Sequence, residues 1–232
     1  MWVAALFTAV GMWGLVVAIS SLAATLVASL VPGRTFYPAI TSEVLYGLVS
    51  LLLIQLTGGM RAYSVLSGAP AYKLVLAVSI SLTLSLLMTG LARRGGHYEP
   101  PYLPKGAVER AVLLLVIAPL GEELLFRGLL EGYLLLSLGG GSFSMAVAAI
   151  LPAILFSAVH YIPYREAPPT CLRWILTIAL VAGLVAGFFR IYANSLMPAV
   201  LTHSCFNLGG MIGGRLGAGP RLPESSSQSG PP

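Results

Sequence analysis

Aspartate is absent from this chain of 232 residues, and its eight acidic residues are all glutamates. Any mechanism that needs an aspartate pair is therefore excluded, including that of the aspartyl intramembrane proteases. Charge of either sign is scarce, since 9% of the residues are charged and 57% are hydrophobic, whereas a soluble domain carries about 25% charged residues. Too few charges remain to cover a water-facing surface, so the sequence excludes a soluble or disordered protein and predicts a polytopic membrane protein.

Several hydrolase signatures are also missing. The chain has no HExxH sequence, which excludes a zinc protease of that type, and no GxSxG sequence, which disfavours a serine hydrolase. Its two cysteines, Cys171 and Cys205, lie in or beside apolar stretches and are expected to be buried free thiols. The net charge is +5, but the cations stand singly between apolar runs, so no nucleic-acid partner is predicted.

Seven apolar stretches divide the chain. A helix needs about 20 residues, each rising roughly 1.5 Å, to cross about 30 Å of hydrocarbon. The sequence therefore predicts an all-α, polytopic transmembrane helical bundle of about seven helices, with six to eight as the range. The stretches cover residues 2–31, 44–56, 73–92, 107–136, 144–161, 171–189 and 195–212.

The cations outside these stretches are distributed unevenly. With seven spans, one side of the membrane holds Arg34, Arg93, Arg94, Lys105, Arg110, Arg165, Arg173, Arg215 and Arg221. The other side holds only Arg61, Lys73 and Arg190. Because cytoplasmic loops carry the excess of Lys and Arg, we expect an integral, multi-pass protein of the lipid bilayer with its C-terminus in the cytoplasm.

Small residues recur at four-residue spacing within the apolar stretches. Such pairs let two helix backbones approach closely, and they predict helix packing rather than chemistry. The glycine pairs are Gly128 and Gly132, Gly183 and Gly187, and Gly209 and Gly213.

Two adjacent carboxylates, Glu122 and Glu123, lie inside the fourth stretch. A charged residue at the centre of a membrane helix costs about 2.5–3.5 kcal/mol on insertion scales, so each carboxylate needs a partner or a polar cavity. Glu123 has Arg127 four residues along its own helix face, and we interpret that pair as mainly architectural. Glu122 is turned about 100° away and gains nothing from Arg127. It is therefore the functional candidate.

Two histidines and one amide also fall in apolar stretches. His160 ends the run Phe156-Ser-Ala-Val-His160, and His203 precedes Asn207 by one helical turn. Each histidine alone is typical of a satisfied core residue. Together with a spare glutamate they form a set that can activate water, with a carboxylate and an imidazole to take a proton and an imidazole and an amide to donate hydrogen bonds.

Three spaced motifs occur in a fixed order along the chain. They are Glu122-Glu123-x-x-x-Arg127, Phe156-x-x-x-His160 and His203-x-x-x-Asn207. In this order they resemble the signature motifs of the CPBP family of intramembrane proteases, which includes the type II CAAX prenyl endopeptidases and the bacteriocin-processing or self-immunity proteins. The resemblance covers about residues 108–208, and no motif position departs from it.

This resemblance implies a glutamate-dependent endopeptidase that cleaves a membrane-associated or lipidated peptide; a prenylated CAAX tail is one candidate, and the substrate stays open. It implies that Glu122 and His160 hold and deprotonate water, and that His203 and Asn207 stabilise the oxyanion. Glu123, Arg127 and Phe156 would order the site or touch the substrate. We therefore divide the chain into three regions, with N-terminal transmembrane helices in 1–106, the catalytic part in 107–214 and a tail in 215–232 whose composition predicts disorder.

Three alternatives stay open at this point. No cofactor is favoured, but Glu122, His160 and His203 could supply three zinc ligands with water as the fourth. Glutamate and histidine inside the membrane also suit a proton-coupled transporter, although the internal repeat of many carriers is missing. A scaffold or self-immunity factor would keep the fold without the chemistry.

Overall fold

The computed structural model describes residues 2–92, 98, 100 and 103–217, which form helices joined by turns with no strand among them. The predicted all-α bundle is confirmed. Both cysteines are buried and free, as expected. Helix α11 (Met197–Gly217) continues into the predicted tail, and the rest of that tail lies outside the described residues. The division into three regions stays a prediction.

Within the described part of the chain, five helices are long and apolar enough to cross a membrane. They are α1 (Trp2–Leu30), α2 (Phe36–Thr57), α4 (Ala71–Ala92), α8 (Ser142–Val159) continued by α9 (Tyr161–Tyr164), and α10 (Pro169–Ala193). The short helix α3 (Gly59–Ala62) follows α2. All seven predicted stretches are helical, because the remaining two form α11 and a segmented helix.

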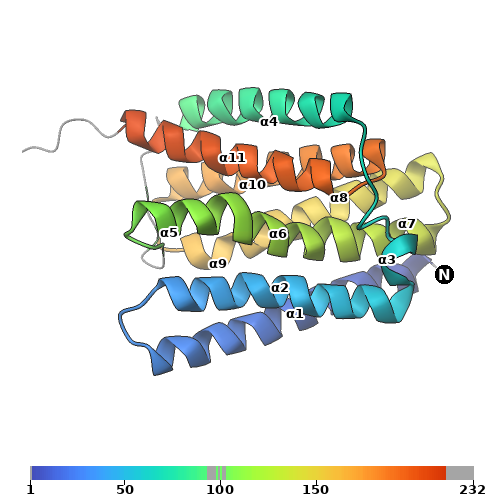
Figure 1. The fold of residues 1–232 in the computed structure, drawn as a ribbon, viewed down its shortest axis with the longest axis horizontal. Coiled ribbons are helices and arrows are strands. Elements are labelled where there is room, and N and C mark those ends of the chain that lie inside the picture. The colour runs from blue at the N-terminus through green and yellow to red at the C-terminus, as the bar shows by residue number, and fades with distance from the viewer. Residues whose placement is uncertain (1, 93–97, 99, 101–102, 218–232) are drawn as a thin grey trace, which may run out of the picture.

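The segmented helix carries both motif glutamates. Its consecutive parts are α5 (Ala107–Val112), η2 (Leu113–Ile117), α6 (Ala118–Glu123), η3 (Leu124–Glu131) and α7 (Gly132–Leu138), of which η2 and η3 are π-helical. It passes between two groups of helices (Figure 1), with α2 packed on one side of α6 and α11 on the other. Helix α4 covers α11, and α8 packs against α10. The two glutamates are therefore inside the bundle.

The π-helical segment η2 has a local cause in Pro119. Proline has no N–H group, so the carbonyls four and five residues before it, at Leu115 and Leu114, lose the partners that a helix would supply. The N–H of Ala118 reaches back to the Leu113 carbonyl instead. Helix α11 satisfies the two orphaned carbonyls with side chains, since Asn207 Nδ2 donates to Leu114 at 2.7 Å and Ser204 Oγ donates to Leu115 at 2.9 Å. Unpaired carbonyls are costly in a membrane, so this exchange joins the two helices.

The predicted small-residue contacts are present. A Cβ atom on Gly209 would lie 2.7 Å from Ser85 Cβ, and one on Gly213 would lie 3.0 Å from Thr89 Cβ, so α11 approaches α4 as closely as side chains allow. The closest approach involving the motif helix is at Gly121. A Cβ atom there would overlap the backbone carbonyl of Glu43 in α2, lying 2.9 Å from its carbon.

We predict that Gly121→Ala lowers the melting temperature in detergent, because the new methyl group meets backbone that cannot rotate away. Overpacking of this kind costs about 1–3 kcal/mol. Gly90→Ala in α4 is the matched control, since no atom lies within 4 Å of the added Cβ, and alanine is favoured over glycine in a helix by about 1 kcal/mol. Equal melting temperatures for the two variants would contradict this packing.

Candidate active site

An ion pair buried in the bundle occupies the centre of the site. Arg127 Nη1 donates to Glu123 Oε1 at 2.6 Å, and each side chain is only 1% exposed. Arg127 Nη2 also donates to the Gly183 carbonyl of α10 at 2.8 Å, and its guanidinium lies 4.9 Å from the ring centre of Phe156 in α8. The predicted Glu123–Arg127 pair is therefore present, and it joins the motif helix to two others.

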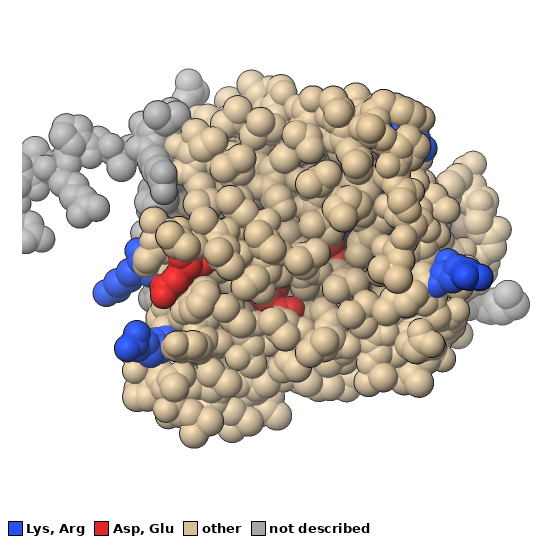
Figure 2. Space-filling model, in the orientation of Figure 1, with Lys and Arg blue, Asp and Glu red and all other residues tan. Residues whose placement is uncertain are grey.

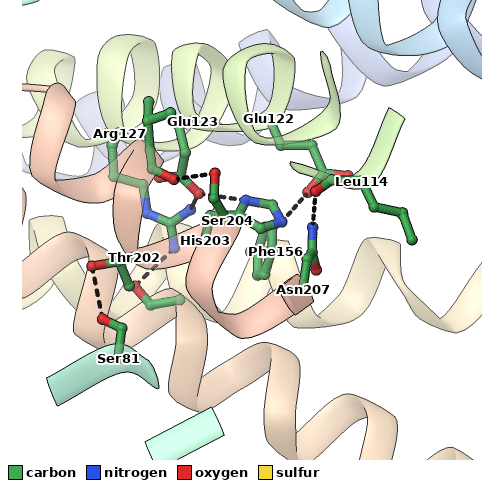
Figure 3. Close-up of polar contacts among 12 residues, drawn as sticks. Ser81, Leu114, Glu122, Glu123, Arg127, Phe156, Thr202, His203, Ser204 and Asn207 are labelled. Carbon is green, nitrogen blue, oxygen red and sulfur yellow. Dashed lines mark hydrogen bonds and ion pairs between the residues drawn. The ribbon is translucent and has the colours of Figure 1, made fainter. Parts of the chain in front are cut away.

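The same glutamate oxygen orients His203 (Figure 3). His203 Nδ1 lies 2.9 Å from Glu123 Oε1. Because an ionised carboxylate only accepts hydrogen bonds, Nδ1 carries the proton and the other ring nitrogen, Nε2, is turned towards Glu122. Nε2 lies 3.6 Å from Glu122 Oε2. Helix α11 thus presents one imidazole between two carboxylates of α6.

Glu122 differs from Glu123 in its partners and its exposure. Its side chain is 12% exposed, and its buried Oε2 atom has no hydrogen-bond partner among the described residues. As predicted, it gains nothing from Arg127 on its own helix. Figure 2 shows glutamate surface recessed between uncharged residues in the middle of one face, with lysines and arginines at the edges of that face. The carboxylate that lacks a cation is the one with access to the outside.

The second motif is built around an aromatic ring. Phe156 is 2% exposed, and its ring centre lies 4.7 Å from that of His160 and 5.3 Å from that of His203. His160 Nδ1 donates to the Phe156 carbonyl at 2.8 Å, which leaves Nε2 as the nitrogen for chemistry. Phe156 therefore separates the two histidines.

The two histidines come from helices that enter the bundle at different heights. Counted along the sequence, His160 ends its helix whereas His203 lies near the start of its own. In the structure both imidazole rings lie against the ring of Phe156, with centres 4.7 Å and 5.3 Å away, so the two residues are at a similar depth. The relative depth of the two histidines follows from the packing of the helices and not from their positions in the sequence.

Asn207 lies one turn beyond His203. Its Nδ2 donates to the Leu114 carbonyl at 2.7 Å, as Figure 3 shows. One amide hydrogen is therefore used in joining helices, and the second remains for other partners.

The predicted zinc set is only partly assembled. Glu122 and His203 lie near one another, but no three His, Cys or Glu side chains in the described ranges are placed so that they could hold one metal ion. We therefore derive no step through a metal, and metal dependence stays a prediction.

Sequence reasoning placed Arg190 outside the membrane, and that prediction is wrong. Arg190 lies within α10 and is 4% exposed. Its Nη2 donates to the Tyr63 carbonyl at 2.7 Å, and its Nε lies 3.7 Å from Glu131 Oε1. These partners allow α10 to continue past Phe189. The sequence could not show this, because contacts between distant segments leave no local pattern in it.

Sequence reasoning also missed Ser204 and Glu43. The predicted second stretch begins at residue 44, and Glu43 was assigned no role. Helix α2 begins at Phe36, so Glu43 lies about two turns inside it.

Comparison with protein families identifies the region that carries these residues. Residues 104–209 match the family model described as type II CAAX prenyl endopeptidase Rce1-like. Over this region the chain is similar to that family. The resemblance seen in the motifs is thereby confirmed, and it indicates a protease acting at the membrane. Taken with the apolar helices, the Rce1-like region makes the chain an integral membrane protein. Comparison with curated proteins and with solved structures gives no match.

We predict that Glu123→Ala and Arg127→Ala each lower the melting temperature strongly, because either change leaves a buried charge without its partner. Removing one member of a buried pair costs about 3–5 kcal/mol. Glu109→Ala, at an exposed position of α5, is the control and should leave the melting temperature unchanged. Unchanged stability in both pair variants would mean that the pair has no architectural role.

Proposed function

We propose that the protein is a glutamate-dependent intramembrane endopeptidase in which Glu122 is the general base. The observation that carries this proposal is the arrangement of α6 around His203. Glu123, which is paired with Arg127, holds Nδ1 of the imidazole, and Glu122 faces Nε2 without a guanidinium or ammonium partner. A carboxylate that is positioned in this way and is not bound by Arg or Lys can take a proton from water.

The reaction that fits these groups is hydrolysis without a covalent intermediate. Water adds to the carbonyl carbon of the scissile peptide bond, and Glu122, with His160 beside the site, accepts the proton that the water loses. The negative charge moves to the carbonyl oxygen. Glu122 then gives its proton to the departing nitrogen, the C–N bond breaks, and a carboxylic acid and an amine remain.

His203 and Asn207 are proposed as donors to that oxyanion. With Nδ1–H bonded to Glu123, His203 donates from Nε2 only when it is protonated, and its charge is then balanced by the carboxylates on either side. Asn207 contributes the amide hydrogen that Leu114 does not use. Such donors stabilise the transition state more than the ground state, because they act on charge that develops during the reaction.

The proposed substrate is a peptide bond near the end of a membrane-bound, lipidated chain, of the prenylated CAAX type. The site supports this choice because its carboxylates lie inside an apolar bundle, where a lipid anchor concentrates a peptide. Cleavage of matched peptides with and without a prenyl group, by purified protein in liposomes, tests it. The proposed reaction is metal-free, so the same assay after prolonged chelation should give the same rate, whereas recovery by zinc alone would contradict it.

We predict that Glu122→Gln keeps the fold and loses cleavage. The isosteric amide removes an uncompensated buried charge, so the melting temperature should not fall. General base catalysis contributes about 10²–10⁴ in rate, and the loss of the carboxylate beside the attacking water should lie at the upper end of that range. Retention of more than about a tenth of the wild-type rate would remove Glu122 from this role and favour a scaffold or transporter.

We predict that Asn207→Ala lowers kcat by about 10²–10³, as the loss of one oxyanion donor does in a well-studied protease. Ser204→Ala is the matched control, because Ser204 makes the neighbouring hydrogen bond from α11 to the Leu115 carbonyl and has no proposed part in the reaction. Each variant loses an interhelical hydrogen bond worth about 0.6 kcal/mol. Equal rates for the two variants would assign Asn207 to packing alone.

A further inference from the structure

Helix α4 is bonded to α11 through two buried hydroxyl groups. Ser81 Oγ donates to Thr202 Oγ1 at 3.0 Å (Figure 3), and Ser85 Oγ donates to the Phe206 carbonyl at 2.9 Å. The two serines are one helical turn apart, and each is at most 1% exposed. Because a buried polar group in a membrane is costly unless it is bonded, each serine ties α4 to α11.

The two acceptors on α11 stand directly before the residues proposed to bind the oxyanion. Thr202 precedes His203, and Phe206 precedes Asn207. Successive residues of a helix point about 100° apart. The same turn of α11 therefore bonds to α4 through one face, and through another face it presents His203 to Glu123 and Asn207 to the motif helix.

The two helices also pack through small residues, which allow close contact but have few side-chain atoms that interlock and select one register. Gly209 lies against Ser85, and Gly213 lies against Thr89 one turn further along both helices. Membrane helices are held together by van der Waals packing and interhelical hydrogen bonds, without a hydrophobic force between them. The serine bonds are directional, so they fix the position of α11 along α4.

The hydrogen bonds on the other side of α11 are less independent of the reaction. The single hydroxyl proton of Ser204 is shared between the Leu115 carbonyl and the Val200 carbonyl of its own helix, at 2.9 Å and 3.0 Å. Asn207 bonds to the motif helix and is also a proposed oxyanion donor. The serines of α4 bond away from the reacting groups, so their bonds can stay in place while the substrate reacts.

We propose that Ser81 and Ser85 are positioning residues, which place His203 and Asn207 beside Glu122 by holding α11 on α4. Each serine acts through the residue that follows its acceptor and touches no reacting atom. This inference rests on the proposed function, because it concerns the placement of the proposed oxyanion donors. It also gives a part in the reaction to a helix outside residues 104–209, the region that matches the family model.

The first test compares two double variants of α4 in the liposome assay. Ser81→Ala/Ser85→Ala removes both bonds to α11, whereas Ser79→Ala/Thr83→Ala removes two hydroxyl groups from exposed positions of the same helix. A displacement of about 1 Å can lower a rate by about 10²-fold, so we expect kcat of the first variant to fall by about ten- to a hundredfold. Its KM should stay within about twofold of the wild type, because oxyanion donors act mainly in the transition state.

The control variant should keep both kinetic constants of the wild type. Equal kcat values for the two double variants would overturn the proposal, as would a loss that appears in KM alone.

The second test is a rescue at the acceptor, which uses single substitutions of similar shape. Thr202→Val cannot bond to Ser81, whereas Thr202→Ser keeps the hydroxyl group. We expect kcat to fall by at least about threefold in the valine variant and to stay close to the wild type in the serine variant. Adding Ser81→Ala to Thr202→Val should lower kcat no further, because both changes remove the same bond. Losses that add, or a serine variant as slow as the valine variant, would assign Thr202 to packing and overturn the proposal.

The third test needs no activity. His203 Nδ1 is bonded to Glu123 Oε1 at 2.9 Å, so the nitrogen NMR signal of this atom reports on the position of α11. The signal is identified in histidine-labelled protein by its loss in His203→Gln. We expect Ser81→Ala/Ser85→Ala to shift it and Ser79→Ala/Thr83→Ala to leave it in place. A signal that neither variant moves would overturn the proposal.

The tests separate this inference from the proposed function. If Glu122→Gln remains active while the His203 signal shifts as expected, the assignment of the base is wrong and the role of the two serines in placing α11 stands. If Glu122→Gln is inactive and Ser81→Ala/Ser85→Ala changes neither kcat nor the signal, the positioning role is wrong and the base stands.

Discussion

The Glu123 carboxylate is the interaction on which the rest of the site depends. One of its oxygens accepts from Arg127 and from His203, which lie on the motif helix and on α11. Arg127 extends this network to the Gly183 carbonyl of α10. Three helices are therefore oriented by one buried anion. Because an unpaired charge in this environment is strongly destabilising, the network is expected to be formed completely or not at all.

A break in the helical hydrogen bonding supports the same arrangement. Pro119 removes a donor two residues before Gly121, and the carbonyls it leaves unpaired accept from Ser204 and Asn207. A proline inside a membrane helix is usually compensated by neighbouring side chains. Here the compensating residues, Ser204 and Asn207, are on the same helix as His203. Their hydrogen bonds to the unpaired carbonyls therefore also fix the position of α11 along the motif helix, beside the two glutamates.

The helices that precede the family-matched region contribute to the site as well. Helix α2 packs with the backbone of Glu43 against Gly121, the residue before Glu122. The position of the motif helix therefore depends on both halves of the chain.

The sequence by itself determined the membrane class, the seven helical stretches and the ion pair at Glu123 and Arg127, because hydropathy and four-residue spacing are local properties. It also singled out Glu122 by the lack of a partner on its own helix. The sequence did not predict the contacts between helices. The tertiary structure alone placed His203 between Glu122 and Glu123, used Asn207 to satisfy Leu114, and buried Arg190 beside Glu131. It also placed the backbone of Glu43 against Gly121, since residues 78 positions apart become neighbours only when helices pack.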